Sequence, residues 1–267
     1  MSEASTPPPS DDAPRVVLLR SPDRAGEDRY VRALAERGFR ATCRPVLRFA
    51  FAGDPGFAGG DVAARLRRPE QYAGLVCTSP RAARAVAAAL GQQRDARQSA
   101  WQEKPAFAVG PKTAKALRES GLSPTGEDAG DAAALAERIV QAGDNASAHP
   151  LLFLCGNRRR EALPRRLRAE GVAFEECVAY ETHPRTGGPW LGAVDGDAPE
   201  WAVFFSPSGV EAVRRAQPRP GGETVRKAAL GPTTAGALRE VGWPPEAVAV
   251  SPTPAALAEA MAARQSA

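Results

Sequence analysis

The sequence GLVCTSPR at residues 74–81 and the sequence WAVFFSPSG at residues 201–209 decide the fold. In each, a short apolar run ends in Ser-Pro, and a Gly-Pro-x-Thr follows later, at residues 110–113 and 231–234. A short apolar run predicts a buried strand, and proline suits the first position of a helix because it has no amide hydrogen to leave unpaired. The same series of strands, turns and helices, met twice in one order, predicts two similar domains.

Strands and helices alternate along the rest of the chain. Apolar runs near residues 16–20, 107–109, 151–155 and 248–250 predict strands, and each helical segment that follows 16–20, 107–109 and 151–155 ends at a glycine. Two further segments match between the halves, residues 34–38 with 167–171 and residues 131–135 with 253–257. The pattern predicts an α/β protein with doubly wound parallel sheets, and a small-molecule site in a cleft between two lobes.

The composition is that of a globular protein outside membranes. The chain has 267 residues, 43% of them hydrophobic and 25% charged, and no apolar run reaches the ~18 residues of a membrane span. Residues 1–14 are rich in Pro, Ser and Asp and lack the pattern of a targeting segment, so we expect a disordered tail on a cytoplasmic protein. The scattered cysteines (Cys43, Cys77, Cys155 and Cys177) are predicted to be buried, reduced thiols.

The chain carries a modest positive charge. Its net charge is +4 and its pI about 9.1, which suits an anionic ligand. Two arginine runs, residues 158–160 and 165–168, are interleaved with Glu161 and Glu170, a pattern that favours a solvated helix face over a phosphate site. Scattered arginines and an aromatic content of 6% argue against nucleic-acid binding.

The repeated loops offer hydroxyls and amides where parallel strands end. Ligands bind at this edge of doubly wound sheets, and free amides at helix N-termini attract anions such as carboxylates. Glycine-rich phosphate loops and a nucleophile elbow are absent from the sequence, and His149 and His183 lack the spacing of metal ligands. For proton transfer the sequence offers Tyr180, at the end of an extended run; on composition alone a packing role is favoured.

These motifs together resemble the uroporphyrinogen-III synthase family, and its eukaryotic branch most. The resemblance covers residues 16–263 and rests on residues 74–81, 152–157, 204–209, 231–235 and 251–254. It implies two flavodoxin-like α/β domains joined by a two-strand linker. Residues 15–46 with 185–267 would form a discontinuous first domain and residues 47–184 the second, with the chain crossing at the extended segments 41–51 and 174–182.

The resemblance also implies a reaction that needs no cofactor or metal. The linear tetrapyrrole hydroxymethylbilane, with eight carboxylates, loses its terminal hydroxyl as water. Ring closure through a spiro intermediate then inverts the last ring and gives uroporphyrinogen III. The family's enzyme acts chiefly by positioning the substrate. The resemblance implies a cytoplasmic monomer without nucleic-acid or membrane partners.

Family residues carry over by motif. Tyr180 corresponds to the tyrosine that assists departure of the hydroxyl, and the substrate-binding positions are Arg20, Ser79, Arg81, Thr113, Asn157, Ser206, Ser208, Thr233 and Thr234. The alternative left open is a two-lobed binding protein for an organic polyanion, without catalysis.

Overall fold

The chain folds into two compact units. The computed structural model describes residues 10, 12–23, 26–91, 96–142, 148–185, 190, 192–194, 196–216 and 224–265, so most of the expected tail lies outside the described residues. Unit 1 comprises Met1–Arg48 and His183–Ala267, and unit 2 comprises Phe49–Thr182. The chain passes from one unit to the other within two hydrogen-bonded neighbouring strands, β3 (Leu47–Ala50) and β8 (Phe174–Pro184).

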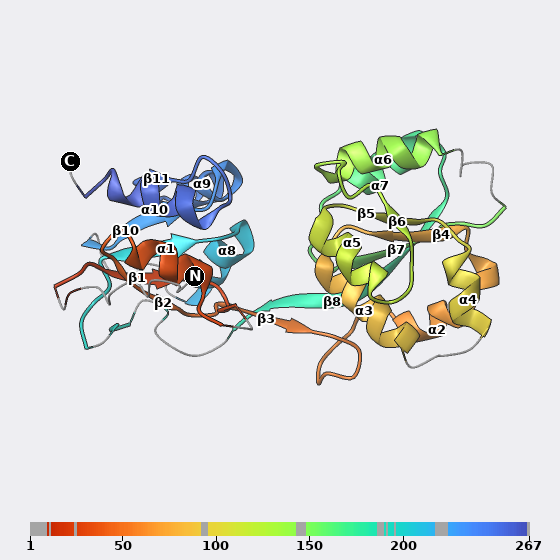
Figure 1. The fold of residues 1–267 in the computed structure, drawn as a ribbon, viewed down its shortest axis with the longest axis horizontal. Helices are drawn as coiled ribbons and strands as arrows, with labels where there is room; N and C mark the ends of the chain where they lie inside the picture. The colour runs from red at the N-terminus through yellow and green to blue at the C-terminus, as the bar shows by residue number, and fades with distance from the viewer. Residues whose placement is uncertain are drawn as a thin grey trace, which may run out of the picture. The chain divides into compact units, whose positions relative to one another are not determined.

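Unit 1 is a parallel five-stranded sheet with helices on both faces (Figure 1). The helices α1 and α10 pack on one face through Leu34, Leu257 and Met261, and α8 and α9 pack on the other through Val213 and Leu238. Its elements are β1 (Arg15–Leu18), α1 (Arg29–Ala35), β2 (Arg40–Cys43), β9 (Trp201–Phe204), α8 (Pro207–Ala216), β10 (Arg226–Ala229), α9 (Pro232–Glu240), β11 (Ala247–Val248) and α10 (Pro254–Ala262).

Unit 2 is built in the same way around a six-stranded sheet (Figure 1). Successive residues of β4 point to opposite faces: Leu75 and Cys77 pack with α3 and α5, whereas Val76 packs with α6 and α7. Besides β3 and β8, its elements are α2 (Val62–Leu66), the 3₁₀ turn η1 (Pro69–Gln71), β4 (Gly74–Cys77), α3 (Pro80–Gly91), α4 (Ala96–Gln102), β5 (Ala106–Ala108), α5 (Pro111–Arg118), β6 (Pro124–Thr125), α6 (Ala132–Gln141), β7 (Leu151–Gly156) and α7 (Ala162–Ala169).

The two sheets have the same spatial order of strands, but the chain begins that order at a different strand in each unit. Unit 1 has the order β2-β1-β9-β10-β11, and unit 2 has the order β8-β7-β4-β5-β6 with β3 added beside β8. The first is the flavodoxin-like order. The matched sequence segments occupy equivalent places, because α1 corresponds to α7, and the Ser-Pro loops follow β9 and β4. Unit 2 is therefore a circular permutation of unit 1.

The repeated loops have the same local structure in both units. Ser79 Oγ accepts a hydrogen bond from the Arg81 amide at 3.2 Å, and Ser206 Oγ accepts one from the Gly209 amide at 3.2 Å. Each hydroxyl thus satisfies an amide at the start of a helix. In the Gly-Pro turns, Gly110 and Gly231 have φ of 78° and 123° with ψ of 152° and 171°, a region that is essentially confined to glycine.

Some elements differ from those predicted. The extended segment at 41–51 is interrupted between β2 and β3, where Pro45 has no amide hydrogen to donate. The short elements α2, η1, α4 and β6 were not predicted, because each is too brief to show a periodic pattern. Cys77, Cys155 and Cys177 are buried, as predicted, whereas Cys43 is only half-buried. All four are free thiols that lie in strands. Among the described residues, no helix is long and apolar enough to cross a membrane.

Alanine substitutions at two glycines of unit 1, one in the Gly-Pro turn and one inside α9, should have opposite effects on stability. Gly231→Ala forces a side chain into a glycine-only conformation and should lower the free energy of unfolding by about 2 kcal/mol. Gly236→Ala, inside α9, adds a Cβ that meets nothing within 4 Å and should raise it by about 0.5–1 kcal/mol. Urea unfolding of both variants measures this, and a Gly231→Ala protein as stable as wild type would contradict the prediction.

Candidate active site

A cavity of about 300 Å³ lies in unit 2 where β4 and β7 run side by side. The helix α3 leaves β4 toward one face of the sheet and α7 leaves β7 toward the other, so the two loops diverge at the carboxyl ends of the strands. Such a switch point is where doubly wound folds bind ligands. The cavity brings together two predicted site residues, Ser79 and Tyr180, and adds the arginine run 158–160 and the start of α6.

Tyr180 is aimed by an irregularity in the sheet. Cys155 is paired with Val178, whereas the next residue, Gly156, is paired with Tyr180, so β8 carries one extra residue at this point. Such a bulge turns the following side chain. The Tyr180 ring lies against Gly156, where an added Cβ would be 2.5 Å from the ring Cζ and 2.7 Å from Oη. Gly156 is therefore required for the position of Tyr180.

Asn157 fixes the same strand. Its backbone amide donates to the Tyr180 carbonyl at 3.2 Å, and its side-chain Oδ1 accepts from the Thr182 amide at 2.9 Å. Sequence motifs placed Asn157 among the substrate-binding residues. In the structure its side chain joins the end of β7 to β8, and its backbone amide and side chain together hold the backbone on both sides of Glu181.

The Arg81 guanidinium and the rings of Phe49 and Phe51 lie around Tyr180. The Arg81 guanidinium carbon lies 3.5 Å from the Phe49 ring centroid and 5.9 Å from that of Tyr180, and the Phe51 ring centroid is 6.2 Å from Tyr180. Burial lowers the pKa of Arg81, while a hydrogen bond and charge interaction with Tyr180 act the other way. An arginine remains charged across such shifts, so a fixed cation stands beside the tyrosine.

The arginine run 158–160 is not part of a solvated helix face, as the sequence pattern had favoured. Because β7 extends to Gly156 and α7 starts only at Ala162, these arginines lie in the connecting loop and line the cavity. Arg159 is bound by Glu176, with both hydrogen bonds at 2.7 Å, and by Glu161. Arg158 and Arg160 are exposed and make no ion pair with any described residue. On α7 the expectation of a solvated face is confirmed, with Arg165 exposed.

The remaining predicted residues stand at the carboxyl ends of other strands. Thr113 in unit 2 and Thr234 in unit 1 are buried, 2% and 4% exposed, in the first turns of α5 and α9. Thr233 is exposed, and Ser206 and Ser208 are half-buried at the start of α8. Nowhere in the described ranges do three His, Cys, Asp or Glu side chains gather in the manner of metal ligands.

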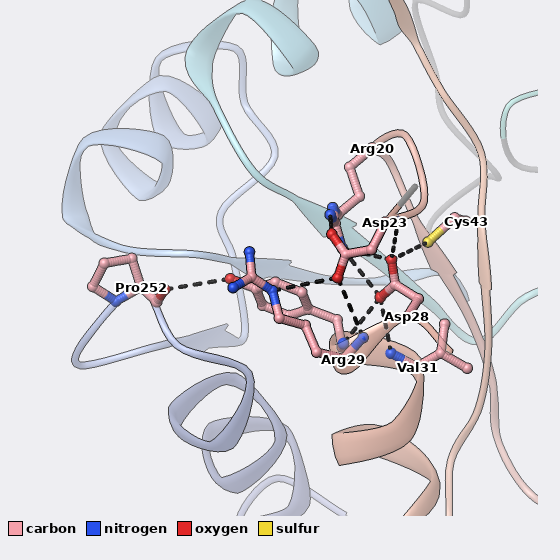
Figure 2. A network of polar contacts seen from close by, with 8 residues as sticks. Arg20, Asp23, Asp28, Arg29, Val31, Cys43 and Pro252 are labelled. Atoms are coloured by element: carbon pink, nitrogen blue, oxygen red, sulfur yellow. Dashed lines mark hydrogen bonds and ion pairs between the residues drawn. The ribbon is translucent and has the colours of Figure 1, made fainter. Parts of the chain in front are cut away.

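Arg20 occupies the equivalent switch point of unit 1, between β1 and β9 (Figure 2). Its guanidinium donates to both carboxylate oxygens of Asp28, at 2.8 and 3.1 Å, and to Asp23 at 2.6 Å. It also lies 4.9 Å from the Tyr30 ring centroid and 5.4 Å from that of Phe205. This side chain, which sequence motifs placed in the substrate site, is held by partners of its own unit.

Asp28 is the centre of that network. Its carboxylate caps α1 by accepting from the Tyr30 and Val31 amides, and it also accepts from the Asp23 amide and the Cys43 thiol. Burial and the nearby Asp28 raise the pKa of Cys43 to about 12, so the thiol stays protonated and unreactive. Signals for the network were present in the sequence as a polar residue before a helix and an Arg-x-x-Asp at 20–23.

Comparison with known proteins identifies the family. The chain matches the family described as "Uroporphyrinogen-III synthase HemD" over residues 28–259. It is 30% identical over 245 residues to uroporphyrinogen-III synthase of Schizosaccharomyces pombe, which covers 88% of this chain and 92% of the relative. It is 32% identical over 174 residues to the uroporphyrinogen-III synthase of Saccharomyces cerevisiae, a match that covers 59% of this chain and 63% of the relative. The chain belongs to the uroporphyrinogen-III synthase family.

Solved structures of the family have the same fold. The synthase of Helicobacter pylori matches with a TM-score of 0.61 at 18% identity, over 94% of this chain and 99% of that one. A mutant synthase from the extremely thermophilic bacterium Thermus thermophilus matches with a TM-score of 0.60 at 18% identity, over 95% and 100%. The predicted fold class, two doubly wound α/β domains, is confirmed.

The Arg20 network predicts a stability effect without a binding effect. Arg20→Gln leaves Asp28, whose side chain is 7% exposed, without its cation and should lower the free energy of unfolding by roughly 2–4 kcal/mol. Burial raises the pKa of Asp23, but the hydrogen bonds and charges of Arg20 and Arg29 together outweigh it, so the net effect is a decrease. Wild type should therefore gain stability from Asp23 above about pH 4 and lose it as the pH falls further. In Arg20→Gln this acid-side loss should be smaller, because only Arg29 still interacts with Asp23.

Denaturant titrations at several pH values, with steady-state kinetics alongside, measure both effects. A variant with a raised KM and unchanged stability would contradict the structural role of Arg20.

Proposed function

We propose that this protein converts hydroxymethylbilane to uroporphyrinogen III with loss of water and inversion of the last ring, as a cyclising lyase of tetrapyrrole biosynthesis. Membership of the family supports the overall reaction. The assignment of roles to individual residues rests on the unit 2 cavity. A tyrosine, a helix-capping serine and arginines line this cavity together at one switch point.

Tyr180 is proposed to assist the first step. The substrate's hydroxymethyl oxygen takes a proton from the Tyr180 hydroxyl, its bond to carbon breaks, and the departing water leaves an electron-poor azafulvenium cation. The Arg81 cation, 5.9 Å from the ring centroid, stabilises the negative charge that grows on the phenol oxygen as the proton moves. A proton released later, when the product regains its aromatic pyrrole, restores the tyrosine.

Positioning governs the remaining steps. The substituted carbon of the last ring attacks the electron-poor methylene carbon of the azafulvenium, the spiro intermediate fragments, and the ring recloses in the inverted orientation. Without control, the free end of that ring closes instead and gives the symmetric isomer. Rigid amides and hydroxyls at the strand ends are suited to holding a polycarboxylate in one conformation, which by itself contributes large rate factors.

We further propose that the protein acts as a cytoplasmic monomer. The free cysteines in strands support a reducing compartment, because oxidising compartments favour disulfides. Light scattering of the purified protein at several concentrations tests the monomer, and a mass of twice 28.1 kDa would contradict it.

The reaction is tested by the isomer formed. Freshly prepared hydroxymethylbilane is incubated with the protein, and the products are oxidised to porphyrins and separated. The type III isomer should dominate, whereas a buffer control should give type I. Only type I in the presence of protein would contradict the proposal, and tight binding of substrate without turnover would favour a binding protein instead.

The geometry around Tyr180 predicts a coupled pair of variants. Tyr180→Phe removes the proton donor and should lower kcat about 100-fold with little change in stability. Gly156→Ala displaces the Tyr180 ring and should lower kcat in the same direction. In a protein that already carries Tyr180→Phe, Gly156→Ala should add little, because no hydroxyl remains to be displaced.

A matched glycine controls for the added methyl group. Gly91, the last residue of α3, has no atom within 4 Å of an added Cβ, so Gly91→Ala should leave kcat unchanged. Fully multiplicative effects of Tyr180→Phe and Gly156→Ala would show that Gly156 does not act through Tyr180.

A further inference from the structure

We propose that Arg158 and Arg160 bind the two carboxylates of the pyrrole ring that carries the hydroxymethyl group, inside the unit 2 cavity. The proposal rests on the proposed function and specifies which part of the substrate this cavity takes. It assigns a binding role to two residues that the sequence pattern had placed on a solvated surface.

The charges in the loop single out these two arginines. Arg159, between them, is held by Glu176 and Glu161 and so serves the structure of unit 2. Arg158 and Arg160 line the same cavity, and no carboxylate of a described residue pairs with them. The acidic residue in the lining, Asp131, is used as a helix cap: one of its oxygens accepts from the Ala133 and Ala134 amides at 2.9 Å. Two cations therefore remain for a ligand.

The size of the cavity limits what it holds. A volume of about 300 Å³ stands at the lower end of the range for small-molecule pockets, which reach ~1,000 Å³. It suits one pyrrole with an acetate and a propionate, and it is too small for a linear chain of four such rings. Two carboxylates on one ring match two unpaired guanidinium groups, which bind carboxylates in a planar, paired geometry.

Tyr180 identifies the ring. Its side chain lines the same cavity as the two arginines. In the proposed reaction Tyr180 protonates the hydroxymethyl oxygen, and that group is attached to one terminal ring only. The ring bound by Arg158 and Arg160 is then the one whose hydroxymethyl group faces Tyr180.

Unit 1 lacks this chemistry at its equivalent position. There Arg20 is paired with Asp23 and Asp28, and Arg29 is paired with Asp23, so the network is close to neutral and offers no unpaired guanidinium to an acidic ring (Figure 2). The two switch points of the duplicated fold have thus diverged, and recognition of the reacting ring's carboxylates belongs to unit 2.

The test compares three variants of the arginine-rich segment. The double variant Arg158→Gln/Arg160→Gln removes the cavity cations, Arg158→Lys/Arg160→Lys keeps their charge, and Arg165→Gln on α7 removes an exposed arginine outside the cavity. For the Gln double variant, KM for hydroxymethylbilane should rise at least about tenfold, a typical loss for charge-assisted contacts. The Lys variant should recover part of this affinity, and Arg165→Gln should match wild type.

A binding measurement separates this proposal from the proposed function. Porphobilinogen, a monopyrrole with one acetate and one propionate, is titrated into each protein by ligand-observed NMR, together with its dimethyl ester. Wild type and Arg165→Gln should bind the diacid and not the ester, and the Gln double variant should bind it at least about tenfold more weakly.

The outcomes are distinct. If wild type forms only the type I isomer, the proposed function fails, and the monopyrrole titration alone still decides the arginine site. Equal binding of the diacid by wild type and the Gln double variant, or an equal loss in Arg165→Gln, would overturn the site. Thermal melts within about 2 °C of wild type for all variants exclude unfolding as the cause.

Discussion

Parallel pairing of β4 with β7 is the constraint on which the site depends. The pairing aligns Gly74 with Leu151 and Cys77 with Leu154, so both strands end at the same edge of the sheet. The chain then turns to opposite faces, through α3 after β4 and through α7 after β7. Backbone cannot fill the space between diverging loops, and a cavity with amides and hydroxyls at its rim follows from the topology.

In the duplicated fold, differences at a few loop residues give the same topology two different roles. Both units keep the helix-capping serine and the Gly-Pro turn, which stabilise the strand-to-helix connections. At the switch point of unit 1, Arg20 is neutralised by its own carboxylates and stabilises the start of α1. In unit 2 the corresponding loop carries two arginines without partners among the described residues. The scaffold is shared, and the chemistry differs through a few loop residues.

The sequence predicted what depends on local chemistry and missed what depends on pairing. Ser-Pro and Gly-Pro turns can be predicted because proline and glycine are typical of particular backbone conformations. Tyr180 was found through the family motif. The bulge that aims Tyr180, and the contact of its ring with Gly156, arise from the register between β7 and β8, for which no local pattern exists. The arginines at 158–160 were assigned to a helix because the charge pattern does not show that α7 starts only at Ala162.

The central claim is that the fold positions the substrate while Tyr180 only assists departure of the hydroxyl. A single-turnover experiment with Tyr180→Phe in excess over hydroxymethylbilane tests it most directly, by following both the rate and the ratio of the type III and type I isomers. The account predicts a rate about 100-fold lower with the share of type III close to that of wild type. A product that shifts largely to type I while the substrate stays bound would contradict it, because Tyr180 would then control the conformation as well as the proton.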